Sequence, residues 1–429
     1  MARNETITMA HGSGGRDSAA LMREIFGRHF SNEILDRLED AAVLEMPLLG
    51  EGQRQSHIVV STDSFVVTPL EFPGGDIGKL AVCGSVNDVL MMGAAPGYLT
   101  CGYIIEEGLA VETLDRIVAS MARAAEEAGV MIVAGDTKVI ERRIEPGAMD
   151  DSGASGPGLF INTAGIGFLR NRIASSGNGG SPERGGIAER GGSPERGGIA
   201  GRGGIAGRGG IAERGGLAER GGLADGGELA ENGEPANSGF GAFATIAAPA
   251  AARAQEGDAV IVSGSLGDHH ACILSARLAL ANGIRSDCAA LTDVVDALYG
   301  SGADIHTMRD VTRGGLGTVL NEIAASSGVQ IELDEGSIPV TEEVKAFCGI
   351  MGLDPIYMGN EGKMIAIVPA KDAEKALQAM KNTVHGSGAC IIGHIATPAS
   401  DTHGVTMKTR IGGIRRIPVL QGEGLPRIC

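Results

Sequence analysis

Apolar residues recur along the first part of this chain with two different spacings. Spacings of three and four residues predict helices over 76–92 and 111–129, and Gly129 is a typical residue for ending the second helix. Apolar runs of strand length cover 57–65, 98–106, 131–134 and 159–169. The run at 131–134 is followed by Gly-Asp-Thr, which predicts a turn. This half of the chain is therefore predicted to be a framework of strands and helices.

The same two spacings return after residue 257. The predicted elements there are strands at 258–264 and 364–368 and a helix at 271–281. Another strand ends in Asp310, and Arg313, Gly314 and Gly315 follow it at the start of an apolar helical face. Backbone amides at a helix N-terminus bind anions, and an arginine beside them adds charge. The segment therefore predicts an anion-binding corner.

Three polar side chains in this half have two interpretations each. Glu361 precedes the strand at 364–368, and it is either a solvated turn residue or a proton carrier that faces the anion-binding corner. His269 and His270 lie just before the helix at 271–281. They are interpreted either as metal ligands or as a polar pair at a helix start. Because no further His or Cys stands at ligand spacing, the polar pair is favoured.

Residues 181–228 consist of eight hexads such as IAERGG and SPERGG. An apolar residue at every sixth position is superficially like a left-handed parallel β-helix, but the Gly-Gly pairs give nothing to pack. The composition favours a disordered linker. The predicted divisions are a Gly-rich lead-in at 1–37, an N-terminal domain at 38–170, an insert at 171–240, a C-terminal domain at 241–412 and a flexible tail at 413–429.

The composition of the chain argues against several classes of function. The chain has 429 residues, 43% of them apolar, and a formal net charge of −17, which argues against a nucleic-acid or anionic-membrane partner. The seven cysteines include no Cys-x-x-Cys pair and no zinc spacing. With no apolar stretch of signal-peptide or membrane-span length, the expected location is the cytoplasm.

Four aspartates in the first half stand at element ends or in apolar surroundings: Asp40, Asp63, Asp88 and Asp136. Any one of them is explained as a helix cap or a turn residue. All four together, in a chain without zinc ligands, predict a site for a hard cation. Oxygen ligands of this kind suit Mg²⁺ bound together with phosphates.

The two ends of the chain are rich in glycine. The loop at 11–16 either cradles an anion on its amides or is a plain flexible loop, and it is not a Walker A sequence. Gly422, Gly424 and Pro426 keep the last residues out of helices, and Cys429 places a thiol at the tip. That thiol is either an inert terminal residue or a group that the tail delivers to a site.

These blocks, in this order, resemble the HypE family of hydrogenase maturation proteins, which are carbamoyl dehydratases. That family belongs to the superfamily of aminoimidazole ribonucleotide synthetase, selenophosphate synthetase and thiamine-monophosphate kinase. The resemblance covers nearly the whole chain except roughly 171–240, and the terminus LPRIC distinguishes this family within the superfamily. The matching blocks are HGSGG at 11–15, EDAAVL at 39–44, STDSFVV at 61–67, GGDIGKLAVCGSVNDVLMMGA at 74–94, GDTKV at 135–139, SGSLGDHH at 263–270, MRDVTRGGL at 308–316, NEIA at 321–324, GNEGK at 359–363 and LPRIC at 425–429.

The resemblance implies a two-domain fold of the aminoimidazole ribonucleotide synthetase type. An N-terminal α+β domain pairs its sheet with its twin in a homodimer, a C-terminal α/β domain follows, and ATP lies between the two domains. The four aspartates match positions that hold Mg²⁺ and ATP. Lys138 and Glu361 match candidates for proton handling, and Cys429 matches the modified thiol. Other positions expected to contact the nucleotide are Asn87, Gly135, Thr137, Gly267, Asp268, Asp310, Arg313, Gly314, Gly315 and Asn360.

In the resembled family a carbamoyl group arrives on the terminal cysteine from HypF. ATP activates it, water is formally lost, and the resulting thiocyanate gives cyanide to the iron of a [NiFe] hydrogenase on a HypC–HypD complex. Phosphorylation is needed because a carbamoyl oxygen is a poor leaving group. The reaction therefore requires a neutralised γ-phosphate, in-line positioning and a base. A Gly/Pro tail supplies the reach.

Two positions depart from the family pattern. Val311 stands where a proline is usual, which predicts a looser turn, and His270 stands where a glycine is usual, which predicts crowding of the anion-binding corner. Two other functions stay open from the residues. A phosphotransferase of the same superfamily would stay active without Cys429, and a non-catalytic scaffold would bind ATP but form no product on the cysteine.

Overall fold

The computed structural model describes residues 6–13, 15–46, 57–142, 158–170, 248–397 and 403–420. The predicted disordered insert at 171–240, and Cys429 with the residues from 421 onward, lie outside the described residues. Within them, no helix is long and apolar enough to cross a membrane.

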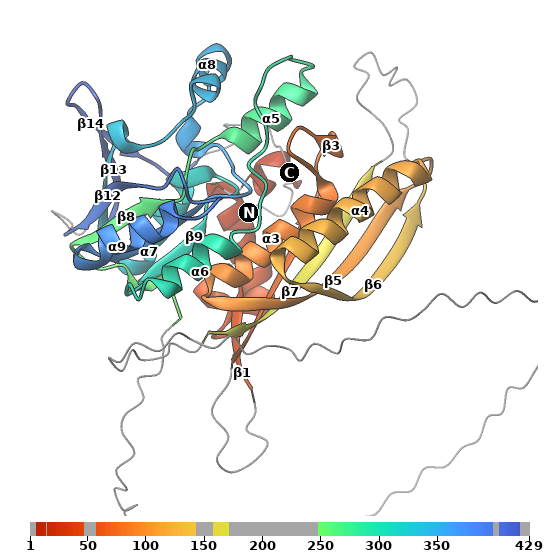
Figure 1. Cartoon of the computed structure of the whole chain (residues 1–429), viewed down its shortest axis with the longest axis horizontal. Helices are drawn as coiled ribbons and strands as arrows, with labels where there is room; N and C mark the ends of the chain where they lie inside the picture. The colour runs from red at the N-terminus through yellow and green to blue at the C-terminus, as the bar shows by residue number, and fades with distance from the viewer. Residues whose placement is uncertain are drawn as a thin grey trace, which may run out of the picture. The chain divides into compact units, whose positions relative to one another are not determined.

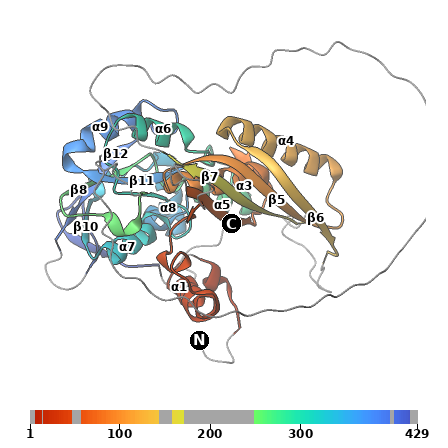
Figure 2. The same ribbon diagram turned by 90° about the horizontal axis from the view of Figure 1, so that it is seen from below.

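The N-terminal part is built on a five-stranded sheet with one helical layer (Figure 1). In spatial order its strands are β1 (Ala42–Glu45), β2 (His57–Phe65), β7 (Leu159–Leu169), β5 (Ala94–Glu106) and β6 (Met131–Ile140). Neighbouring strands are antiparallel except for β5 and β6, which run parallel. Two helices, α3 (Ile77–Met91) and α4 (Val111–Ala128), lie over one face of this sheet, as the second view shows (Figure 2).

Both helices follow from their sequences. Asp76 caps α3, because its side chain accepts hydrogen bonds from the backbone N–H groups of Gly78 and Lys79. Nearly all residues of α3 are buried, as expected of a helix that is apolar on every side. Helix α4 buries one stripe of side chains and ends at Gly129, as predicted; the φ of Gly129 is 72°, the left-handed conformation in which glycine commonly ends a helix.

The turn predicted at Gly135, Asp136 and Thr137 is wrong. These residues lie inside β6, which continues to Ile140 in register with β5. In the parallel pairing, β5 supplies hydrogen-bond partners for the backbone N–H and C=O groups of these residues, which a turn would have left unpaired. Strand β6 is the edge of the sheet, and all ten of its residues are exposed.

The C-terminal part is built on a seven-stranded sheet. In spatial order its strands are β14 (Ile414–Ile417), β13 (Gly404–Lys408), β10 (Gln330–Asp334), β12 (Cys390–Ala396), β8 (Asp258–Val262), β11 (Met364–Pro369) and β9 (Thr307–Asp310). One face packs on α6 (Thr292–Gly300) and α9 (Ala370–Lys381), and the other packs on α7 (Gly315–Ser327). Helices α5 (Asp268–Arg277) and α8 (Glu342–Met351) contact each other beside this sheet. The predicted tail, from residue 413, thus begins with a strand of the sheet.

The remaining elements are short. They are β3 (Glu71–Phe72), β4 (Gly75–Asp76), α1 (Arg16–Leu21), α2 (Arg28–Phe30) and the short helical segments η1 (Met9–Gly12), η2 (Met22–Gly27), η3 (Leu35–Arg37), η4 (Ala251–Arg253), η5 (Glu335–Ser337) and η6 (Pro355–Tyr357). Arg170, the last described residue before the insert, is fixed to α6. It forms an ion pair of 2.5 Å with Asp296, and its guanidinium lies 5.3 Å from the centre of the Tyr299 ring.

Candidate functional site

Carboxylates from four elements meet where the two sheets approach each other. Asp40 precedes β1, Asp63 lies on β2, Asp88 lies on α3 and Asp310 ends β9. Burial raises the pKa of Asp310 to about 6, and the nearby Asp63 adds to the shift. Burial also raises the pKa of Asp88 well above its usual range, with Asp310, Asp40 and Asp63 acting in the same direction. Three of the four predicted metal-site aspartates thus lie together.

Arg309 compensates part of this negative charge. Its Nε lies 2.7 Å from Oδ1 of Asp40, and its Nη2 lies 3.3 Å from Oε2 of Glu322 on α7. Burial still raises the pKa of Asp40 well above its usual range, although Arg309 opposes the shift. Within the described residues, Oδ2 of Asp40 is buried without a hydrogen-bond partner.

Like charges and an orphaned oxygen in one buried cluster fit a hard divalent cation, which would bind oxygen ligands and relieve the repulsion. In the part of the chain that the structure describes, no three acidic, His or Cys side chains stand at the spacing of a completed metal site. The cluster thus has the right donor chemistry, and a nucleotide phosphate would supply further oxygen ligands.

Within one copy of the chain, Asp136 and Lys138 do not lie in the carboxylate cluster of Asp40, Asp63, Asp88 and Asp310. Asp136 stands opposite Gly102 on β5, and the same row continues through Asn162 on β7 to Ser64 on β2. Three strand spacings of about 4.8 Å place Asp136 roughly 14 Å across the sheet from that end of β2. Its carboxylate pairs with Lys138 Nζ at 2.5 Å. Gly135 and Thr137 share this edge position.

The anion-binding corner has the predicted backbone. Gly314 and Gly315 have φ values of 80° and 63° at the start of α7, and a Cβ on Gly315 would lie 2.5 Å from the backbone of Tyr357. Half-exposed Arg313 places Nη2 3.9 Å from Oδ1 of Asp63. The corner therefore faces the carboxylate cluster, an arrangement suited to a phosphate bridged by a cation.

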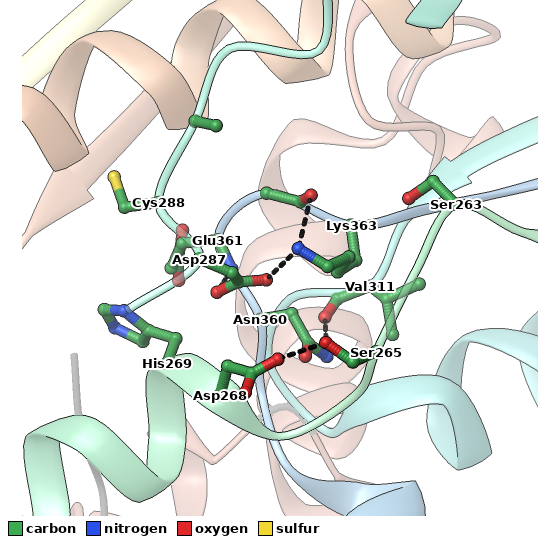
Figure 3. Close-up of polar contacts among 12 residues, drawn as sticks. Ser263, Ser265, Asp268, His269, Asp287, Cys288, Val311, Asn360, Glu361 and Lys363 are labelled. Carbon is green, nitrogen blue, oxygen red and sulfur yellow. Dashed lines mark hydrogen bonds and ion pairs between the residues drawn. The ribbon is translucent and has the colours of Figure 1, made fainter. Parts of the chain in front are cut away.

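The loop 358–363 places Glu361 beside Asp287 and Lys363 (Figure 3). Glu361 is 9% exposed, and burial raises the pKa of its carboxyl well above its usual range, with Asp63 and Asp310 adding to the shift. Its backbone N–H donates to Oδ1 of Asp287 at 3.1 Å, and Lys363 Nζ pairs with the other oxygen at 3.2 Å. A buried carboxyl with a raised pKa beside a phosphate site can carry a proton. The interpretation as a solvated turn residue is therefore wrong.

Val311 does not loosen its turn. It is fully buried, its N–H donates to the carbonyl of Lys363 at 2.9 Å, and its carbonyl accepts from Asn360. A proline at this position would lack the first of these bonds. The departure therefore joins Asp310 more firmly to the Glu361 loop, contrary to the sequence-based prediction.

Asn360 joins three segments of the site (Figure 3). Its side-chain amide donates to the carbonyls of Val311 and Met358, and its oxygen accepts from the N–H of Gly267. These are interactions within the protein, so a direct contact between Asn360 and a nucleotide stays a prediction. Asp268, next to Gly267, accepts from Ser265 at 2.5 Å, and burial raises its pKa.

Asn360→Ala is expected to destabilise the fold by about 2–3 kcal/mol, because the N–H of Gly267 and the carbonyl of Met358 lose this partner, while the carbonyl of Val311 keeps only the backbone N–H of residue 360. The measurement is the free energy of unfolding in urea. Asn382→Ala, at an exposed helix end, is the matched control and should change it by less than about 0.5 kcal/mol. Equal effects of the two substitutions would contradict this role of Asn360.

Asn87 makes the same kind of contribution on α3. Its amide donates to the carbonyl of Ala289 and its oxygen accepts from the N–H of Leu291, so both ends fix the loop that carries Asp287. A contact between Asn87 and ATP also stays a prediction. Sequence reasoning missed Asp287, Lys363 and Arg309. The two basic residues lie inside quoted motifs, whereas the loop of Asp287 has no periodic pattern.

His269 and His270 are buried at the start of α5, as the polar-pair interpretation predicts. His269 Nδ1 lies 2.7 Å from Oγ of Ser286, whereas Nε2 of His270 has no hydrogen-bond partner within the described residues. Burial lowers the pKa of His269 to about 4 and that of His270 to about 3. Both imidazoles are therefore neutral in the folded protein at neutral pH.

His270→Gln is expected to gain stability over the wild type as the pH falls from about 6.5 to about 4. Unfolded His270 takes up a proton below about 6.5 and the folded residue does not, so acid favours unfolding by about 1.4 kcal/mol per pH unit. The buried carboxyls have raised pKa values and act with the opposite sign, so only the difference between variant and wild type isolates this histidine. Urea unfolding at several pH values measures it, and a constant difference would contradict the prediction.

Comparison with known proteins gives the family. Residues 38–169 match the AIR synthase related protein N-terminal domain, and residues 255–405 match the corresponding C-terminal domain. The carbamoyl dehydratase HypE of Azotobacter vinelandii is 39% identical over 430 residues, which cover all of this chain and 98% of the relative.

Two solved structures are similar over their full length. A HypE–HypF complex contains a chain 37% identical, with a TM-score of 0.67, and the match covers 94% of this chain and 100% of that one. A HypE structure in complex with ATP is 39% identical, with a TM-score of 0.64, and the match covers 99% and 100%. These full-length matches, together with the buried carboxylates beside an anion-binding corner, show that the chain belongs to the AIR synthase-related superfamily and, within it, to the HypE family of carbamoyl dehydratases.

Proposed function

We propose that this chain converts a carbamoyl group on Cys429 into a thiocyanate at the expense of ATP, and so supplies the cyanide ligand of a hydrogenase iron. The observation that carries the proposal is the meeting of the carboxylate cluster, the N-terminus of α7 and the buried Glu361 in a chain of this family. HypF is proposed to load the thiol, because a solved relative is a complex with HypF. A HypC–HypD complex is proposed as the acceptor, and the cytoplasm as the location.

The residues have distinct roles in this reaction. Asp40, Asp63 and Asp88 would hold Mg²⁺, which neutralises phosphate charge when bound. The amides of Gly314 and Gly315, with Arg313, would orient the phosphates of ATP. The carbamoyl oxygen attacks the γ-phosphorus and ADP leaves. Glu361 is placed to accept a proton from the carbamoyl nitrogen. The C–O bond then breaks, phosphate departs with the second N–H proton, and the nitrile remains on sulfur.

A homodimer is proposed to complete the site. Edge strand β6 exposes Met131 by 63% and Val139 by 67%, and unpaired apolar edges of this kind are typical of contacts between chains. Asp136 and Lys138 lie on that strand, and Asp136 is about 14 Å across the sheet from the end of β2 that carries Asp63. A second copy packed on β6 would cover this edge and would give both residues a site to act on.

Val139→Asp is expected to shift the protein from dimer to monomer, because it places a charge in the middle of the proposed apolar contact. Sedimentation velocity measures the change. Val384→Asp provides the control, since Val384 is 80% exposed but lies outside this sheet. A dimer that persists in the first variant would place the interface elsewhere.

The test of the function is intact-mass spectrometry after incubation with HypF, carbamoyl phosphate and ATP. The wild type should gain the mass of a carbamoyl group and then, in an ATP-dependent step, lose the mass of one water. Cys429→Ala should show neither step. An adduct that never loses water would support a carrier function instead. ATP turnover that survives in Cys429→Ala would favour a phosphotransferase.

A further inference from the structure

The chain just before the C-terminal tail is fixed by side chains of two other elements. After β14, the carbonyl of Ile417 accepts from the side-chain amide of Asn321 on α7 at 3.0 Å. One residue later, the carbonyl of Pro418 accepts from the hydroxyl of Tyr357 at 2.9 Å. The segment Ile417–Leu420, here called the tail root, therefore has a defined path over α7 and η6.

The N-terminal segment adds a third contact to the tail root. The backbone N–H of Arg16 donates to the carbonyl of Leu420 at 3.0 Å. Buried Gly15 is packed so closely that a Cβ there would lie 2.4 Å from the same carbonyl oxygen. Because real Cβ atoms do not approach an oxygen so closely, only glycine fits this position without movement. The last glycine of the HGSGG loop thus contacts the tail root.

The tail root is attached to elements that also carry the site. Tyr357 directly precedes the loop 358–363, which holds Glu361. Its ring packs on α7 so closely that a Cβ on Gly317 would lie 2.7 Å from it. Helix α7 begins at Gly315, in the anion-binding corner. The start of the tail is therefore fixed relative to both the proton carrier and the anion-binding corner.

We propose that Gly15, Arg16 and Tyr357 anchor the tail root and so set the point from which the Cys429 thiol reaches the ATP site. They are positioning residues, and this inference rests on the proposed function. Eight residues lie between Leu420 and Cys429, so the nine Cα–Cα steps give a reach of about 30 Å. Release of these contacts would move the last fixed point of the chain back to Ile417. The tether would then be about twelve Cα–Cα steps long, and its starting direction would no longer be fixed. The effective concentration of the Cys429 thiol at the ATP site falls with roughly the −3/2 power of the tether length, or more steeply.

The experiment compares the reaction of the attached tail with that of a separate peptide. The variants are Gly15→Ala and Tyr357→Phe, alone and combined, with Gly349→Ala as control because nothing lies within 4 Å of its added methyl group. In the carbamoylated full chain, the single-turnover rate of water loss should fall at least about 1.5-fold in the combined variant. A carbamoylated peptide of residues 422–429, supplied to Cys429→Ala versions of the same chains, should react equally in all of them.

Equal losses with the attached tail and the peptide would show that the substitutions damage the site, and this would overturn the anchor. So would an unchanged rate with the attached tail. A second readout does not need the dehydratase reaction. A fluorophore on Cys429, in a background with half-buried Cys390 replaced by serine, should show a larger amplitude of fast anisotropy decay in the variants than in the control. If the wild type loses no water, the proposed function fails while the anisotropy still tests the anchor.

Discussion

Asp88→Asn is expected to raise the thermal stability of the nucleotide-free protein while it abolishes ATP-dependent water loss. Asp88 is partly buried on α3 near Asp40, Asp63 and Asp310, and burial and these carboxylates raise its pKa well above the usual range. An uncharged amide of nearly the same shape removes this repulsion, with an expected gain of about 1–3 kcal/mol. The same substitution removes a proposed cation ligand, so the rate should fall at least about 100-fold.

Differential scanning calorimetry and the mass-spectrometric assay measure the two effects on one preparation. Asp115→Asn, at an exposed position on α4, is the matched control and should change neither. An Asp88→Asn protein that is less stable than the wild type would show that the carboxylate has a favourable partner in the folded chain. Full activity in that variant would remove Asp88 from the proposed cation site.

Arg309→Met is expected to destabilise the fold by about 3–5 kcal/mol. The side chain of Arg309 is 11% exposed and bridges Asp40 to Glu322, and the surrounding carboxylates raise its pKa against the effect of burial. Methionine keeps the apolar stem, so the loss reports the missing charge. Without the guanidinium, Asp40 and Glu322 remain partly buried and uncompensated.

Urea unfolding compares this variant with Arg415→Met. Arg415 pairs with Asp354, but its side chain is 44% exposed, and exposed ion pairs contribute only about 0–1 kcal/mol. The prediction would fail if the two substitutions had similar effects on the free energy of unfolding. A double variant of Arg309→Met with Asp40→Asn should recover part of the loss, because the amide no longer needs a cation.

The parts of the fold that sequence predicts well depend on local signals. Helix α4 ends at Gly129 as expected, and Asp310 and Glu361 lie beside the glycines of α7, because strand ends and turn residues carry their own patterns. The prediction failed where distant segments decide the structure. The path of β6 depends on parallel pairing with β5, so no local pattern shows that Asp136 lies across the sheet from its expected neighbours.

The same limit applies to the groups that support the site. Arg309 pairs with Asp40, far away along the chain, and Asp287 with Lys363, so neither pair leaves a trace in local spacing. Asn87 and Asn360 were predicted to contact the nucleotide, yet in the structure both bond to backbone groups of neighbouring loops. A polar residue in a motif can hold a site together without touching what binds there.

The fixed position of Arg170 has a consequence for how this gene can vary. Its ion pair with Asp296 and its contact with Tyr299 hold one end of the segment 171–247, and Ala250, whose N–H bonds the carbonyl of His306, holds the chain where it returns. For a flexible loop with fixed ends, each doubling of length costs only about 0.6 kcal/mol. The composition of the hexads predicts a disordered linker, so gain or loss of whole hexads should leave the free energy of folding almost unchanged.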